Sequence, residues 1–155
     1  MTTPEQRLAE QGLKIPEMVA PFAAYAPAVR HGSQIWVSGQ LPVRDGKLVA
    51  RGVVGTDVTT EQATEAARQA ALNAIAAVRE NVDNLSQVAQ ILKVVIFVAS
   101  APGYEEQGKV GNGASELLGA VFGDAGVHAR SAIGVAALPL GAAVEVELVA
   151  AISEA

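Results

Sequence analysis

Apolar residues follow a helical spacing over one long stretch in the middle of the chain. From Thr59 to about Val82 they recur at intervals of three and four residues, at Ala63, Ala67, Ala70, Ala71, Ala74, Ile75 and Val78. This spacing places them on one face of an α-helix. Thr59 and Gln62 add the sequence of a capping box at its start. Because most of this face is alanine, we expect the helix to lie close against a β-sheet.

Other stretches have the patterns of β-strands. VAQILKVVIFVAS, residues 88–100, is β-branched and nearly continuously apolar, which predicts a strand buried on both faces. QIWVSG, residues 34–39, predicts a shorter strand that Gly39 ends. Near the C-terminus, RSAIGVAA and AAVEVELVAAI predict the last two strands, and we expect LPLG between them to be the turn of a hairpin.

The remaining segments complete an α+β arrangement. Thr3, Pro4 and Gln6 predict a short capped helix that Gly12 ends, and a linker with three prolines leads from there to a first strand. Asp45-Gly46 predicts a tight turn before another short strand, and a second long helix is expected from about Tyr104 to Val121. The order β-β-β-α-β-α-β-β predicts a mixed sheet with two helices packed on one face. We expect one domain over residues 1–155, of which residues 1–20 form an N-terminal helix and linker extension.

Composition indicates how such a domain meets its surroundings. The chain has 155 residues, of which 50% are hydrophobic and only 17% are charged. An average soluble domain has about 25% charged residues. A small domain with so few charges has difficulty covering its surface, and large exposed apolar patches mark interfaces. We therefore expect a homo-oligomer; the alternative is a monomer with an unusually uncharged surface.

Several classes of protein are disfavoured by the same counts. The net charge is −5 without a cluster of basic residues, which argues against nucleic-acid binding. There is no cysteine, and the two histidines lack ligand-like spacing, so we expect no metal site. No apolar run approaches the roughly 20 residues that span a bilayer, and the N-terminus lacks the pattern of a signal peptide. We expect a soluble cytoplasmic protein without a membrane partner.

Three charged residues stand in the most strand-like part of the chain. Strand side chains alternate, so Glu145 and Glu147 share one face while Val144, Val146 and Leu148 point to the other. The glutamates could simply form the solvated face of an edge strand, and Arg130 could be a surface residue. From residue chemistry alone, both this interpretation and a functional one remain open.

The C-terminal segment carries a family resemblance. ARSAIGVAALPLGAAVEVELVA resembles the signature of the Rid family, the reactive intermediate deaminases also called YjgF or L-PSP endoribonuclease-like proteins. YAPAVRHGSQIWVSGQLPV, a helix that begins in a Glu-Gln pair, and KVVIFVAS agree with the family in order. The leading helix and KVGNGASELL resemble a longer subgroup of the family. The resemblance covers the chain after about residue 20.

This resemblance implies a fold, an assembly and a reaction. The fold is chorismate-mutase-like, and three subunits form a homotrimer with clefts between neighbours. In the deaminase branch, 2-imino acids or their enamine tautomers are hydrolysed to 2-keto acids and ammonia, without a metal or an organic cofactor. The ligand would be a small metabolite that bears a carboxylate.

The resemblance also implies roles for individual residues. Arg130 matches the arginine that holds the substrate carboxylate, and Glu145 matches the glutamate that positions or activates water. Tyr25 and Gly39 match an aromatic residue and a glycine of the cleft. Asn112 matches a substrate-binding asparagine, although its spacing to Arg130 is one residue longer here. Two positions depart from the deaminase pattern: the position that is often cysteine in the deaminases is Ala132 here, and the position that is commonly glutamate is Gly134.

Geometry gives a separate expectation for the site. In a flat hairpin, Arg130 and Glu145 would lie roughly 15–20 Å apart at about 3.3 Å per residue. A single small ligand could then meet both only if a strand bends sharply or if the two residues come from adjacent chains, and we expect a site between subunits. A non-catalytic trimeric binder of small carboxylates remains the alternative function, and a ribonuclease is a third. Among other candidates, His128 could line the cleft or be an ordinary loop histidine. GNGAS is expected to open a helix turn, and Ser38 and Ser131 lack a base.

Overall fold

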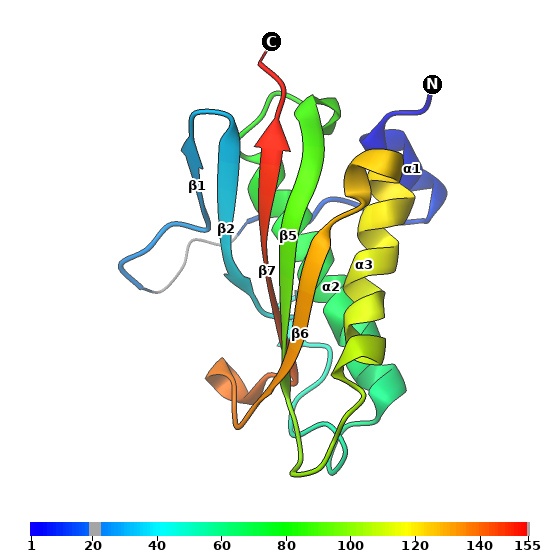
Figure 1. Cartoon of the computed structure of the whole chain (residues 1–155), viewed down its shortest axis with the longest axis vertical. Coiled ribbons are helices and arrows are strands. Elements are labelled where there is room, and N and C mark those ends of the chain that lie inside the picture. The colour runs from blue at the N-terminus through cyan, green and yellow to red at the C-terminus, as the bar shows by residue number, and fades with distance from the viewer. Residues whose placement is uncertain (19–22, 155) are drawn as a thin grey trace.

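A five-stranded sheet with helices on one of its faces forms the body of the protein (Figure 1). The computed structural model describes residues 1–18 and 23–154. Its α-helices are α1 (Pro4–Glu10), α2 (Thr60–Arg79) and α3 (Gln107–Phe122). Its strands are β1 (Ala28–His31), β2 (Gln34–Gln40), β3 (Val43–Arg44), β4 (Lys47–Leu48), β5 (Val88–Ala99), β6 (Ala129–Val135) and β7 (Val144–Ile152). The predicted α+β class with a mixed sheet is confirmed. Part of the predicted linker, residues 19–22, lies outside the described residues.

Local signals placed the first two helices and one turn correctly. Thr59 and Gln62 form both hydrogen bonds of a capping box, and α2 begins at the residue after Thr59. Thr3 and Gln6 do the same for α1. The Asp45-Gly46 turn joins β3 to β4, with φ angles of 53° and 77° that suit an Asp-Gly pair.

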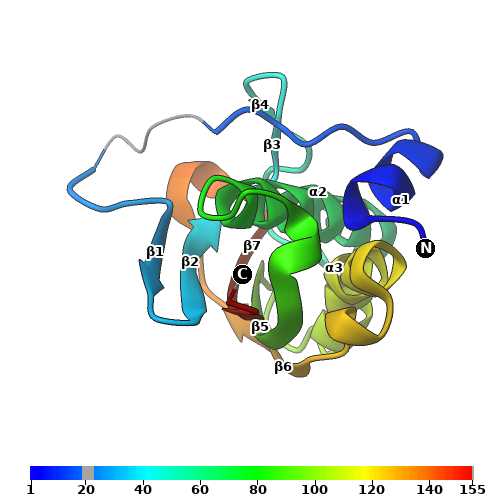
Figure 2. The same ribbon diagram turned by 90° about the horizontal axis from the view of Figure 1, so that it is seen from above.

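The helices cover only one face of the sheet. Viewed from above, α2 and α3 lie on the same side of the strands, and α1 lies near them (Figure 2). The alanine face of α2 is buried against the sheet, as the pattern predicted. The helices α2 and α3 also pack closely on each other, because Gly113 brings the α3 backbone against Thr64. None of the helices described is long and apolar enough to cross a membrane.

The expected C-terminal hairpin is wrong. The strand order is β1-β2-β7-β5-β6, so β5 lies between the last two strands of the chain. The strand β6 runs parallel to β5, and β7 runs antiparallel to it. The parallel pair follows from α3, which connects β5 to β6 as the crossover helix of a β-α-β unit. Residues Pro139–Gly141 then form a short 3-10 turn rather than the turn of a hairpin.

The opposite face of the sheet is uncovered by any described part of this chain. It presents residues that alternate with the core positions: Trp36, Lys93, Val95, Phe97, Ser131, Ile133, Glu145, Glu147 and Val149. We call this set the open sheet face. Trp36 is 56% exposed and Ile133 is 46% exposed. The prediction that β5 is buried on both faces is therefore wrong for the single chain, because its second side lies on this face.

Candidate functional site

Arg130 projects from the edge of the sheet toward the helical layer. It is the second residue of β6, and its cross-strand partner on β5 is the core residue Val94. Directly paired residues share a face of the sheet, so the Arg130 side chain points to the same side as α3. The arginine is exposed, because β6 has a neighbour on one side only.

A stripe of small and polar residues on α3 receives this side chain. Gly108, Asn112, Ser115 and Gly119 follow one another at steps of four, three and four, and therefore lie on one face of the helix. Gly111, three residues after Gly108, borders the same face. A Cβ atom at Gly111 would come within 3.2 Å of Arg130 Nη1. The glycine thus lets the guanidinium lie against the helix backbone. The expectation that GNGAS only opens a helix is wrong, since the segment lies inside α3.

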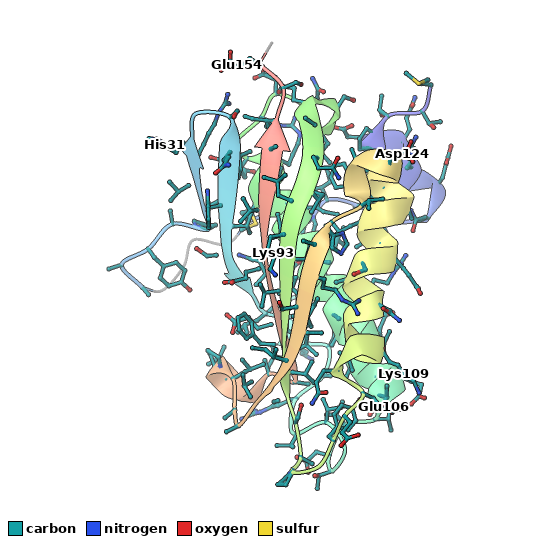
Figure 3. All side chains as sticks on the ribbon, in the orientation of Figure 1. His31, Lys93, Glu106, Lys109, Asp124 and Glu154 are labelled. Carbon is teal, nitrogen blue, oxygen red and sulfur yellow. The ribbon has the colours of Figure 1, made fainter. Side chains whose placement is uncertain are left out.

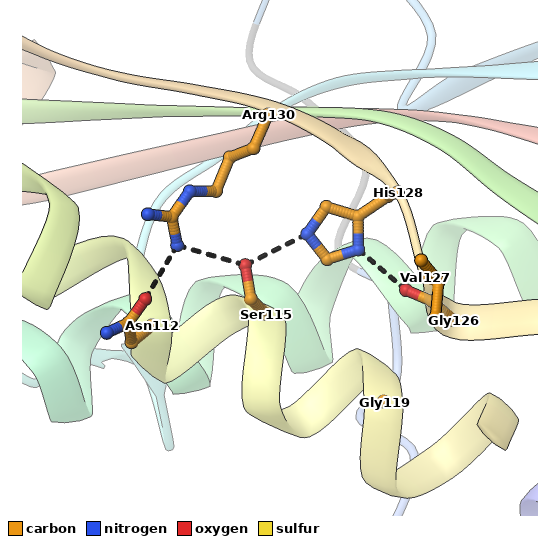
Figure 4. A pocket seen from close by; sticks show the side chains of 7 residues that line it. All are labelled: Asn112, Ser115, Gly119, Gly126, Val127, His128 and Arg130. Carbon is orange, nitrogen blue, oxygen red and sulfur yellow. Dashed lines mark hydrogen bonds between the residues drawn. The ribbon is translucent and has the colours of Figure 1, made fainter. Parts of the chain in front are cut away.

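Hydrogen bonds to α3 hold one end of the guanidinium (Figure 4). Nη1 donates to Asn112 Oδ1 at 2.8 Å and to Ser115 Oγ at 3.2 Å, and Nη2 donates to the Gly108 carbonyl oxygen at 3.2 Å. A guanidinium has five N–H donors. Among the described residues, the Nε–H and the second N–H of Nη2 therefore have no acceptor. These two donors lie in one plane and match the two oxygens of a carboxylate.

A pocket of about 380 Å³ extends from Arg130 along the gap between α3 and β6. It is lined by Asn112, Ser115, Gly119, Gly126, Val127, His128 and Arg130. His128 Nε2 lies 2.9 Å from Ser115 Oγ, and His128 Nδ1 lies 2.6 Å from the Gly126 carbonyl oxygen. Of the two interpretations of His128, the structure favours the one in which it lines a pocket, whereas Ser115 was not identified from the sequence. The helical spacing of Asn112 and Ser115 was the signal that could have found it.

A second cluster lies on the open sheet face, where Glu145 covers Gly39. The pairing of β2 with β7 shifts register between Val37 and Gln40, which marks a bulge at this glycine. A Cβ atom at Gly39 would overlap the Glu145 carboxylate and lie 3.1 Å from its Cγ. Only glycine leaves room for the carboxylate here. The glutamate belongs to a central strand, so its interpretation as part of an edge strand is wrong.

The environment of Glu145 disfavours its charged form. Its side chain is half-buried on the open sheet face. Burial raises the pKa of the Glu145 carboxyl above its ordinary value of 4.5, and the nearby Glu147 carboxylate raises it further. Figure 3 marks Lys93 on the same face, where its Nζ donates to Ser131 Oγ at 3.1 Å. The Glu145 carboxylate is therefore a stronger base than an exposed one.

Tyr25 lies in the segment that leads into β1 and is 57% exposed. This segment is attached to β2 beside Gly39. Ser38 Oγ donates to the Ala26 carbonyl oxygen at 2.6 Å, and the Ser38 N–H donates to the Pro27 carbonyl oxygen at 2.9 Å. The tyrosine thus approaches the end of the sheet that carries Gly39, with its ring available for a contact outside the chain.

The chain brings the predicted residues together in two separate groups. Arg130 lies with Asn112 on the helical side, and Glu145 lies with Gly39 on the open sheet face. Arg130 pairs with Val94 and Glu145 with Phe97, on opposite sides of β5. At about 3.3 Å per residue and about 4.8 Å per strand, their backbones are about 14 Å apart. Arg130 and Glu145 are thus separated within one chain, as expected. The cause is not a flat hairpin: β5 lies between their strands, and their side chains point to opposite faces of the sheet.

The two departures from the deaminase pattern lie on the arginine side. Ala132 is half-buried near Gly111. A Cβ atom at Gly134 would come within 3.0 Å of Gln107 Nε2 and 3.2 Å of Ser100 Oγ. The neutral side chains of Gln107 and Ser100 already occupy the space beside this glycine. The loss of a glutamate there makes the site less acidic without enlarging it.

Comparisons with known proteins agree with this fold over nearly the whole chain. The sequence model of the family described as "YjgF/chorismate mutase-like, putative endoribonuclease" matches residues 5–152. Protein TCP17 of Trypanosoma cruzi is 42% identical over 137 residues, which are 88% of this chain and 86% of the relative.

Two solved structures are similar in both sequence and shape. The protein Atu1372 of Agrobacterium tumefaciens, described as having unknown function, is 42% identical with a TM-score of 0.90, and 97% of this chain and 92% of that chain are covered. A protein of Shewanella oneidensis described as a "putative endoribonuclease" is 37% identical with a TM-score of 0.94, and 97% of this chain and 100% of that chain are covered. The chain therefore belongs to the YjgF/chorismate mutase-like family.

Proposed function

We propose that this protein is a cofactor-independent hydrolase that converts 2-imino acids, or their enamine tautomers, to 2-keto acids and ammonia. One observation carries the proposal: α3 holds one end of the Arg130 guanidinium and leaves an Nε–H and an Nη2–H for a ligand. A guanidinium edge of this kind binds a carboxylate through two parallel hydrogen bonds, which an ammonium cannot do. The substrate class is therefore a small molecule with a carboxylate next to the reacting carbon.

The chemistry demands little beyond orientation and proton transfer. The carbon of a protonated imine is already electrophilic, and the oxygen of a water molecule adds to it. Glu145 accepts the proton that this water loses, and returns it to the nitrogen of the carbinolamine. The C–N bond then breaks, ammonia leaves, and the remaining hydroxyl transfers its proton to the ammonia as it becomes the carbonyl of the keto acid. The raised pKa of Glu145 suits the first proton transfer, because its carboxylate takes up a proton more readily than an exposed one.

Completion of this site requires more than one chain, and the proposed assembly is a homotrimer. Arg130 and Glu145 lie on opposite faces of their own sheet, so a single small ligand reaches both only when they come from neighbouring subunits. The open sheet face supports this assembly, since it exposes Trp36 and Ile133 without cover from the described chain. A neighbour packed there would place its Arg130 side near Gly39 and Glu145.

A non-catalytic binder of small carboxylates is the second candidate. The neutral surroundings of Ala132 and Gly134, where the deaminases have reactive or acidic groups, favour it. The family description "putative endoribonuclease" favours a nuclease, but a sequence with a net charge of −5 and without a cluster of basic residues is unsuited to RNA.

The test couples an amino-acid oxidase to the protein and follows the imine by its reaction with semicarbazide. A deaminase competes for the imine and slows semicarbazone formation. Arg130→Ala should abolish this effect, while Glu145→Gln should retain keto-acid binding and slow turnover by about 10²-fold or more, as expected for loss of a general base. Wild-type protein that leaves semicarbazone formation unchanged across a range of amino acids, yet binds keto acids, would establish the binder instead.

A further inference from the structure

Ser115 and His128 connect Arg130 to the backbone of the chain through consecutive hydrogen bonds. Arg130 Nη1 contacts Ser115 Oγ, Ser115 Oγ contacts His128 Nε2, and His128 Nδ1 contacts the Gly126 carbonyl oxygen. Figure 4 shows the three side chains in line along the pocket. Neither the serine nor the histidine has a part in the reaction described above.

The direction of each hydrogen bond follows from the groups themselves. The Gly126 carbonyl oxygen can only accept, so His128 Nδ1 carries the proton. In the neutral ring Nε2 is then an acceptor, and it receives the Ser115 hydroxyl hydrogen. Ser115 Oγ in turn accepts from Arg130 Nη1. Each group thus donates to the next one, in the order Arg130, Ser115, His128 and the Gly126 carbonyl oxygen. Every donor in this series has an acceptor.

These contacts restrain a side chain that would otherwise be mobile. Arg130 is exposed on an edge strand, and an arginine side chain is among those that lose most rotamer entropy when they are ordered. A ligand that meets a guanidinium already held by Ser115 and Asn112 does not have to supply this ordering. Asn112 and Ser115 both contact the guanidinium directly, and the Ser115 hydroxyl is in turn oriented by His128.

We propose that Ser115 and His128 are positioning residues that fix the Arg130 guanidinium, before a ligand binds, with its Nε–H and second Nη2–H directed to the ligand carboxylate. This inference rests on the proposed function, in which Arg130 is the carboxylate anchor. It assigns to the pair a contribution to binding, not to the chemical step.

The first experiment measures the order of the guanidinium in the free protein. The Arg130 Nε–Hε signal is identified in a ¹⁵N spectrum by its loss in Arg130→Lys, and its order parameter is measured by relaxation. A held side chain gives a value above about 0.8, and Ser115→Ala or His128→Ala should reduce it below about 0.6. Ser115→Thr, which keeps the hydroxyl, should restore it. The controls Ser86→Ala and His31→Ala change exposed residues elsewhere and should leave it unchanged.

The second experiment measures ligand binding and kinetics in the same variants. With pyruvate as the probe, Ser115→Ala should raise Kd and the imine KM about five- to twentyfold, the order expected for one charge-assisted contact. The kcat value should stay within about twofold. His128→Ala should act in the same direction, and His128→Gln provides a second variant that retains a polar side chain. Because alanine favours helices, Ser115→Ala is expected to fold.

The outcomes separate the two proposals. An unchanged Arg130 order parameter in Ser115→Ala and His128→Ala, or a fall in kcat at constant KM, would overturn the positioning role. If instead Arg130→Ala binds pyruvate as well as the wild type does, the proposed function fails. The order parameter still reports whether the pair holds the guanidinium, because that measurement needs no ligand.

Discussion

Two glycines of α3 should respond to the same substitution in opposite directions. Gly113 faces α2, where an added Cβ atom would overlap the Thr64 carbonyl oxygen and lie 2.9 Å from the Thr64 carbonyl carbon. Gly119 faces the pocket, and an added Cβ atom there would meet nothing within 4 Å. Both are helix-interior glycines, so their intrinsic helix propensities cancel in the comparison. Gly113→Ala and Gly119→Ala thus isolate the effect of helix–helix contact.

The magnitudes follow from packing and propensity. Overpacking of a filled interior costs about 1–3 kcal/mol, and the upper part of this range applies at Gly113 because the obstacle is backbone. Alanine is about 1 kcal/mol more favourable than glycine inside a helix, so the free energy of unfolding of Gly113→Ala should fall by about 1–2 kcal/mol. Gly119→Ala has no such clash and should gain about 0.5–1 kcal/mol. At about 2–4 °C per kcal/mol, Tm should fall by about 2–8 °C in the first variant and rise by about 1–4 °C in the second.

Urea unfolding at one fixed protein concentration is the suitable assay, with sedimentation to establish that both variants keep the assembly of the wild type. The fixed concentration matters because association contributes to the apparent stability of an oligomer. A Gly113→Ala variant as stable as Gly119→Ala would refute the reasoning, since it would mean that α2 and α3 separate without loss.

Two further predictions concern the open sheet face. Since burial raises the pKa of Glu145 in the folded chain, its ionised form destabilises the fold, and stability falls as pH rises through that raised pKa. Glu145→Gln should therefore increase Tm at pH 7 and have no such effect at pH 4, where the carboxyl is largely protonated in both states; an equal gain at both pH values would contradict this. A charge on the exposed apolar part of the face should disrupt the proposed homotrimer, so Trp36→Asp and Ile133→Asp should sediment as single chains at micromolar concentration. Leu140→Asp, at a 73% exposed position outside the face, is the matched control and should remain assembled.

Features with local causes could be read from the sequence. The capping boxes of Thr3 and Thr59 fix where α1 and α2 begin, because their hydrogen bonds join residues only three positions apart. The Asp45-Gly46 turn is equally local. The alternation of Glu145 with its apolar neighbours identified the two faces of β7, since side chains of any strand alternate whatever its partners are.

The pairing of strands was not fixed by such patterns. Periodicity defines which side of β6 is buried, but not whether its neighbour is β5 or β7. The hairpin was the expected pairing because β6 and β7 are consecutive in the chain. A stronger signal lay in the helix between β5 and β6, because a strand, a helix and a strand of one sheet form a parallel pair by a crossover connection. Because of this wrong pairing, Glu145 was expected on an edge strand, whereas it lies on a central strand of the sheet.

The same limit explains why the family motif found only part of the arginine site. Motif positions identified Arg130 and Asn112. Ser115 lies inside KVGNGASELL, but the resemblance implies no role for it, and His128 alone does not differ from an ordinary loop histidine. Asn112 and Ser115 share a face of α3 because three residues make nearly one helical turn, and His128 and Arg130 flank one residue of the chain entering β6. These two short-range patterns meet only because the crossover lays α3 along β6. Correct placement of α3 over the β5–β6 pair would therefore have been sufficient to bring all four side chains together.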